Sequence, residues 1–277
     1  MTQTDLPVRA KIQGEGDLVV LLHGYGGAPR DWRFLLESKN FHFTSVNVNL
    51  CSLLAGPEPI SFHDQADILE TFLRQTVGEK RFHLIGMSYG GALSLVMRER
   101  FGDQVMSHAM INPMPFDPIR HMRHRMLKLM VWARRRSYLS ADVFRFRLGR
   151  LALDQVSKTF QLTNRWRAPK YLMRKIGYLQ KSFDRFIWIA DHEDWSRWAS
   201  TSAAEDLIPT SMIYSMNDPL FSEEAFLHLV EGIEFCRIQQ LTDPEHLVHN
   251  TASAELATFI NGHLEHHQSD AGQAANL

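Results

Sequence analysis

The sequence predicts an α/β fold, in which a mostly parallel central sheet is flanked by helices and carries an inserted helical cap. Short apolar runs alternate with stretches of helical periodicity in residues 1–112 and 207–265, which we assign to one core domain. Between residues 113 and 206 this alternation stops, and a basic pattern of helical periodicity predicts a helical insertion. Residues 266–277 are small and polar, so we expect a disordered tail.

The elements of the core follow from hydrophobic periodicity and local signals. The run from Asp17 to His23 is continuously apolar in its middle, as in a strand that is buried on both faces of a sheet. Ser61 and Asp64 form a capping box that opens a helix with an apolar stripe. Strands are predicted at residues 17–23, 43–49, 81–87, 105–111, 211–216 and 235–241, and further helices at about 91–101 and 252–264.

A Gly-x-Ser-x-Gly motif occupies residues 86–90, between a predicted strand and a predicted helix. A nucleophilic serine in this position stands on a sharp turn, and flanking glycines leave room for that turn and for close helix packing. The start of the helix also favours developing negative charge near Ser88. The alternative is an ordinary serine in a strand-to-helix turn.

A serine hydroxyl needs a base, and the base needs an orienting acid. Asp218 directly follows the predicted strand 211–216, although an aspartate before Pro219 is also an ordinary turn residue. Two histidines compete for the role of base after the last strand. We prefer His246, which lies nearer the strand end, and His249 stays the alternative.

The order Ser88, Asp218, His246, preceded by His23-Gly24-x-Gly26-Gly27, resembles the α/β-hydrolase fold superfamily, in its serine esterase type with a helical cap. The resemblance covers residues 10–112 and 207–264. It implies an oxyanion hole made of the backbone N–H groups of Tyr25 and Tyr89. It also implies that the first histidine of His-x-x-His is catalytic, and that the stretch 113–206 is the cap.

One segment departs from the family pattern. Many relatives carry a glycine-rich segment after the second predicted strand, whereas residues 49–57 of this chain retain one glycine, Gly56. This departure leaves the subfamily open. A serine nucleophile argues against the branches with an aspartate nucleophile, the dehalogenases and epoxide hydrolases.

The resemblance implies cleavage of a carboxylic ester or thioester through an acyl-enzyme on Ser88, as in a carboxylesterase, with no metal or organic cofactor. The same triad could serve an acyltransferase or a C–C hydrolase. The non-enzymatic alternative is a lipid- or partner-binding scaffold. No signal peptide or apolar membrane span is read, and the only two cysteines, Cys51 and Cys236, lie far apart, so a cytoplasmic protein is expected.

The net charge of −1 is a cancellation between two unlike parts of the chain. Residues 120–185 contain 18 Lys and Arg against three acids, a charge of +15, and the remainder carries −16. No nucleic-acid partner is expected. The basic cap has three interpretations: a lid helix with solvated charges, a contact with an anionic membrane surface, or a rim that attracts an anionic acyl substrate.

The cap begins with an amphipathic pattern. On a helix from Ile119, one face carries Met122, Met126, Leu129, Met130 and Ala133, and Arg120, Arg125, Lys128, Arg135 and Arg136 lie on or near the other. His121 and His124 share a helix face, but their basic neighbours would repel a metal ion. The segment Glu245-His246-x-x-His249 lacks the order of a zinc motif, and no phosphate-binding glycine motif is present.

Overall fold

A computed structural model of the chain describes residues 8–53, 58–123, 125–135, 182–198, 207–234, 236–243 and 245–268. The chain divides into two compact units, one made of residues 1–123 and 193–277 and the other of residues 124–192. The predicted core and cap boundaries at 112 and 207 stay predictions.

The first unit contains a sheet of seven strands in the order β1-β3-β2-β4-β5-β6-β7. Neighbouring strands are parallel except for the antiparallel pair β1 and β3. The strands are β1 (Arg9–Gln13), β2 (Leu18–Leu22), β3 (Thr44–Asn49), β4 (Phe82–Met87), β5 (Val105–Ile111), β6 (Thr210–Ser215) and β7 (Cys236–Leu241). The mostly parallel sheet confirms the predicted fold class, and the antiparallel edge strand β1 was not predicted.

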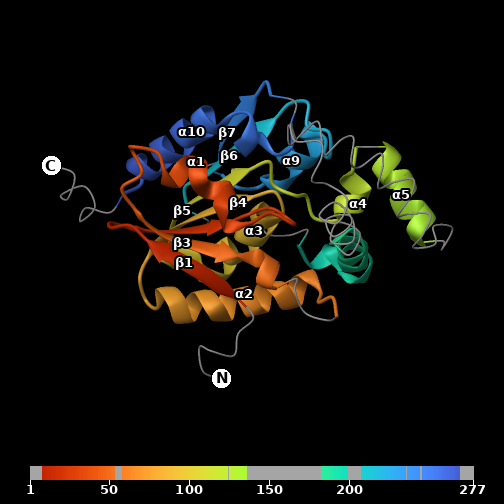
Figure 1. Ribbon diagram of the computed structural model, residues 1–277, viewed down its shortest axis with the longest axis horizontal. Helices are drawn as coiled ribbons and strands as arrows, with labels where there is room; N and C mark the ends of the chain where they lie inside the picture. Colours follow the sequence, from red (N-terminus) through yellow and green to blue (C-terminus); the bar gives the residue numbers. More distant parts are fainter. Residues whose placement is uncertain are drawn as a thin grey trace, which may run out of the picture. The chain divides into compact units, whose positions relative to one another are not determined.

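Helices cover both faces of this sheet (Figure 1). The short α1 (Arg33–Leu36) and the terminal α10 (Ser253–His266) lie together on one side, and α2 (Phe62–Val77) lies on the other. The helix α3 (Tyr89–Phe101) packs against α2, β4 and β5. The core under α1 and α10 consists of fully buried apolar side chains such as Val19, Leu21, Ile85, Ile111, Leu256 and Ile260.

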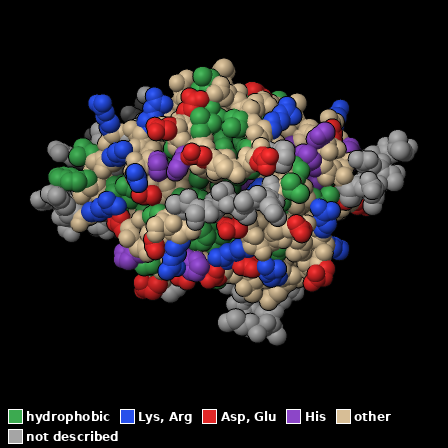
Figure 2. Space-filling view, turned by 180° about the vertical axis from the view of Figure 1, so that it is seen from behind, with side chains coloured by type: hydrophobic (Ala, Val, Ile, Leu, Met, Phe, Trp, Pro, Cys, Tyr) green, Lys and Arg blue, Asp and Glu red, His purple; other side chains and the backbone are tan. Residues whose placement is uncertain are grey.

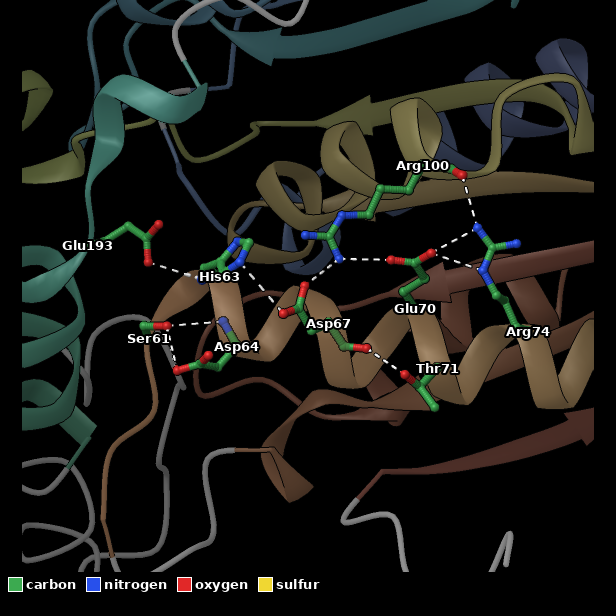
Figure 3. A network of polar contacts seen from close by, with 9 residues as sticks. All are labelled: Ser61, His63, Asp64, Asp67, Glu70, Thr71, Arg74, Arg100 and Glu193. Atoms are coloured by element: carbon green, nitrogen blue, oxygen red, sulfur yellow. Dashed lines mark hydrogen bonds and ion pairs between the residues drawn. The ribbon is translucent and has the colours of Figure 1, made fainter. Parts of the chain in front are cut away.

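Polar side chains hold α2 against α3 (Figure 3). Arg100 of α3 lies 2.8 Å from a carboxylate oxygen of Asp67 and 2.9 Å from one of Glu70, both on α2. Arg74 pairs with the same Glu70 and donates to the carbonyl of Arg100 at 3.1 Å. The predicted N-cap of α2 is present: Ser61 Oγ accepts from the N–H of Asp64 at 3.0 Å. This network fixes the helix that begins beside Ser88.

The first unit also contains two shorter helices near the carboxyl ends of the strands. These are α4 (Pro118–His121) and α9 (Glu223–Leu229). Directly after α4, Met122 forms an isolated bridge with Phe221. The helix predicted from Ile119 is therefore divided, because this extended residue separates α4 from the next helix.

The second unit is described over α5 (Arg125–Arg135) and a helix at residues 182–192. Within it Arg135 forms an ion pair with Asp191, and the rings of Trp188 and His192 stack at 4.4 Å. Leu129, predicted to lie on the apolar face, is 55% exposed. Residues 136–181, with most of the basic charge of the predicted cap, lie outside the described residues, as do residues 269–277 of the predicted tail.

Two surface properties bear on partners. On the face drawn in Figure 2, Lys and Arg side chains are interspersed with Asp and Glu side chains. Within the described ranges, no helix combines the length and the hydropathy that a bilayer crossing requires.

Candidate active site

Ser88 lies in a strained turn between β4 and α3. Its φ of 51° is positive, which is unfavourable for serine. Hydrogen bonds on both sides hold this conformation: the N–H of Ser88 donates to Ile111 at 2.9 Å, and its carbonyl accepts from Gly91 and Met114, each at 2.8 Å. The turn therefore presents the hydroxyl at the carboxyl edge of the sheet, as the motif predicted.

The glycines of the motif are required by close backbone contacts. A Cβ at Gly86 would overlap the carbonyl of Gly90, and a Cβ at Gly90 would overlap that of Leu22. At Gly91 it would lie 2.9 Å from the Cα of Pro113. The start of α3 thus packs directly on the neighbouring strand end.

The structure brings the three predicted triad residues together at the carboxyl ends of three strands. Ser88 Oγ lies 2.7 Å from His246 Nε2, and His246 Nδ1 lies 2.6 Å from Asp218 Oδ2. All three residues are buried. The second carboxylate oxygen of Asp218 accepts from the N–H groups of Leu220 and Phe221, at 2.7 and 2.9 Å. The carboxylate is therefore fixed in position.

These partners determine the tautomer of His246. An ionised carboxylate only accepts hydrogen bonds, so Nδ1 carries the proton and donates it to Asp218. Nε2 is then an acceptor, and it receives the hydrogen bond from the hydroxyl of Ser88. This tautomer leaves the lone pair of the imidazole directed at the serine, as a general base requires.

His249, the alternative base, lies in the short helix Val248–Asn250. Among the hydrogen bonds of the described residues, none joins His249 to Ser88 or Asp218, and its Nδ1 is buried without a partner. Burial lowers the pKa of His249, and the nearby His246 lowers it further, whereas Asp31 raises it. The geometry therefore favours His246.

The predicted oxyanion segment is a tight turn in which Gly27 N–H donates to the carbonyl of Gly24 at 3.0 Å. His23 fixes this turn. Its Nε2 accepts from Leu50 N–H at 3.0 Å, so its protonated Nδ1 donates to Gly24 at 2.8 Å. Burial lowers the pKa of His23, which keeps it in this neutral form. The partner Leu50 belongs to the segment that departs from the family pattern.

Tyr25 lies in this turn, and Tyr89 is the first residue of α3, where the helix supplies no partner for the amide. A Cβ at Gly24 would lie 3.3 Å from that of Ser88, so this turn and Ser88 are in close contact. The rings of Tyr25 and Tyr89 pack edge to face at 5.2 Å. The assignment of the two amides to an oxyanion hole stays a prediction.

Two features of this region were missed in the sequence. An aromatic cluster continues from Tyr89 through Phe62 to Phe116, Trp195 and Trp198, with ring centroids 5.3–6.4 Å apart. The spacing of the two tryptophans was the available signal. The other feature is Asn112, which the sequence marks only as the residue that closes a strand. Among the described residues, no group of three or more His, Cys, Asp or Glu is placed to hold a metal ion.

The sequence matches the alpha/beta hydrolase fold family over residues 17–235, which is most of the chain. The chain belongs to this family, and the predicted resemblance to the α/β-hydrolase fold superfamily is confirmed. No significant match is found among curated proteins.

Solved structures share the fold at low sequence identity. A lipase-esterase related protein from Clostridium acetobutylicum superposes with a TM-score of 0.65 and 14% identity, over 93% of this chain and 99% of that one. A thermophilic esterase from Thermogutta terrifontis gives 0.65 and 15%, over 95% and 94%. An epoxide hydrolase from Bacillus megaterium gives 0.60 and 17%, over 91% and 95%. At this identity the likeness concerns the fold alone.

Proposed function

We propose that the chain is a serine hydrolase that cleaves a carboxylic ester or thioester through an acyl-enzyme on Ser88. The observation that carries this proposal is the hydrogen-bonded line from Ser88 Oγ to His246, at 2.7 Å, and from His246 to Asp218, at 2.6 Å. This geometry supports the roles of nucleophile for Ser88, base for His246 and orienting acid for Asp218 in acyl transfer.

In the proposed mechanism, His246 Nε2 takes the hydroxyl proton as Ser88 Oγ attacks the substrate carbonyl carbon. The backbone N–H groups of Tyr25 and Tyr89 stabilise the oxyanion of the tetrahedral intermediate, and each such donor is worth about 3 kcal/mol. The imidazolium then protonates the leaving group, and Asp218 stabilises its charge. Water, activated by His246, releases the acid and restores the serine.

The aromatic cluster supports an apolar or aromatic acyl group as the substrate class. Tyr25, Phe116 and Trp195 are partly exposed, and each packs on the buried pair Phe62 and Tyr89, which adjoins Ser88. Met114, two residues before Phe116, donates its N–H to the carbonyl of Ser88. The segment that carries the ring of Phe116 is therefore in contact with the turn of the proposed nucleophile. Apolar rings bind acyl or aryl groups by burial and edge-to-face contact.

Turnover of a panel of 4-nitrophenyl esters and acyl thioesters of graded length tests the proposal, with Ser88→Ala as the matched control. We expect hydrolysis by the wild type, a preference for apolar acyl groups, and turnover by Ser88→Ala at least about 1,000-fold lower. Absence of turnover across the panel, or equal turnover by the variant, would overturn it. Added alcohol acceptors separate hydrolysis from acyl transfer.

A further inference from the structure

We propose that Asn112 is a positioning residue for the catalytic base, tying the loop that carries His246 to the ends of β5 and β6. The inference rests on the proposed function, because it assigns Asn112 a part in the work of His246.

The backbone of Asn112 has the left-handed conformation, with a φ of 40°, and the residue is completely buried. It directly follows β5, and its N–H donates to the carbonyl of Ile213 on β6 at 2.9 Å. Asparagine is among the few residues other than glycine that tolerate this conformation. The turn directs its side chain to the end of β6, which leads to Asp218, and to the loop after β7, which carries His246.

The amide of Asn112 bonds to both of these segments. Its Nδ2 donates to the backbone carbonyl of His246 at 2.8 Å, and its Oδ1 accepts from the N–H of Ser215 at 2.8 Å. Ser215 is the last residue of β6, three residues before Asp218, and its hydroxyl donates to the carbonyl of Glu245 at 3.0 Å. One amide and one hydroxyl thus hold the base loop against the strand that leads to the acid.

A fixed backbone at His246 matters because the imidazole must meet two partners at once. Its ring lies between Ser88 and Asp218 at 2.7 and 2.6 Å, so a small shift of the loop lengthens one bond or the other. Misplacement by about 1 Å can cost about 100-fold in rate. Asparagine fits because it supplies a donor for one carbonyl and an acceptor for one N–H.

Two variants separate positioning from stability. Asn112→Gly accepts the positive φ and removes the side chain together with its hydrogen bonds. Asn112→Asp keeps the shape and the acceptor but, when ionised, places a carboxylate oxygen against the carbonyl of His246. The control is Asn261→Ala, which removes another buried amide; this amide donates from α10 to Ser38 Oγ, just after α1, at 2.9 Å.

We expect kcat for 4-nitrophenyl acetate to fall by about 10- to 100-fold in both Asn112 variants, with KM near the wild-type value. In Asn261→Ala, kcat per folded molecule should stay unchanged although Tm falls. Wild-type kcat in Asn112→Gly would overturn the proposal. So would a loss of kcat in Asn112→Gly no larger than that in Asn261→Ala.

A second measurement does not depend on turnover. Proton NMR of the wild type should show a low-field resonance from the Nδ1 proton of His246, assigned by its absence in His246→Gln. We expect this resonance to shift or broaden in Asn112→Gly and to persist in Asn261→Ala. An unchanged resonance in Asn112→Gly contradicts the proposal. If the wild type turns over no ester, the proposed function fails, and this resonance still decides the role of Asn112.

Discussion

The backbone of Gly90, two residues after Ser88, lies directly against the carbonyl of Leu22 at the end of the neighbouring strand. The start of α3 can approach β2 this closely only because the residue has no Cβ. We therefore expect Gly90→Ala to lower Tm sharply and to abolish turnover, since relief of the overlap must move the turn that holds Ser88.

The matched control for this substitution is Gly262→Ala in α10. A Cβ there meets open space, and alanine is favoured over glycine within a helix by about 1 kcal/mol. Circular dichroism should show an unchanged or higher Tm for Gly262→Ala. A Gly90→Ala protein with wild-type Tm and turnover would refute the steric account of the motif.

His23 is predicted to act through the turn that carries Tyr25. His23→Phe replaces the imidazole by a somewhat larger apolar ring and removes the bonds to Leu50 and Gly24, so we expect kcat to fall about 10-fold or more. His83→Phe is the matched control, because His83 is a buried histidine bonded to Ser107 at 2.8 Å, at the opposite end of β4 from Ser88. Steady-state kinetics should show a loss of kcat in the first variant only.

Buried histidines should make the protein sensitive to acid. Burial lowers the pKa of His83 to about 4 and that of His263 to about 3. Asp17 raises the pKa of His83, whereas His267 and Arg81 lower it; His267, His83, His266 and Arg237 all lower that of His263. Below pH 6.5, the histidine pKa in the unfolded chain, the unfolded chain binds protons that the folded chain does not. The free energy of unfolding therefore decreases as the pH is lowered, and the loss levels off below the pKa values of these histidines in the folded chain.

Urea unfolding at several pH values between about 7.5 and 4.5 tests this prediction. The free energy of unfolding should be flat above about pH 7 and should decline below it. The double variant His83→Gln with His263→Gln should show a shallower decline than the wild type. A wild-type free energy that is constant down to about pH 4.5 would argue against the assignment of neutral histidines.

The parallel strands and the proposed triad could be predicted from the sequence because both depend on local signals. A continuous apolar run marked β2, and runs that are mostly apolar marked β4 and β5. The glycines around Ser88 marked a turn that only a few residue types can form. The edge strand β1 was missed because four of its five residues are charged, polar or small, and none is fully buried. The role of Asn112 was missed because its partners, Ser215 and His246, lie more than 100 residues away.

The basic segment 120–185 leads to a prediction about substrate charge. If its Lys and Arg attract anionic substrates toward Ser88, kcat/KM for an anionic ester should fall as salt is added, because exposed charges are screened over about 10 Å at 0.1 M salt. A neutral ester of the same acyl length is the control, and its kcat/KM should not change. If kcat/KM for the two esters changes equally with salt, the segment does not attract anionic substrates.

The central claim is that Ser88 is a nucleophile activated by His246, and the most direct measurement is covalent labelling with a fluorophosphonate probe, located by peptide mass spectrometry. We predict a single adduct on Ser88 in the wild type and in His249→Ala. Labelling should be lost in Ser88→Ala and be at least about 100-fold slower in His246→Ala. An unlabelled wild type, an adduct on another residue, or equal labelling rates in the wild type and His246→Ala would contradict the account.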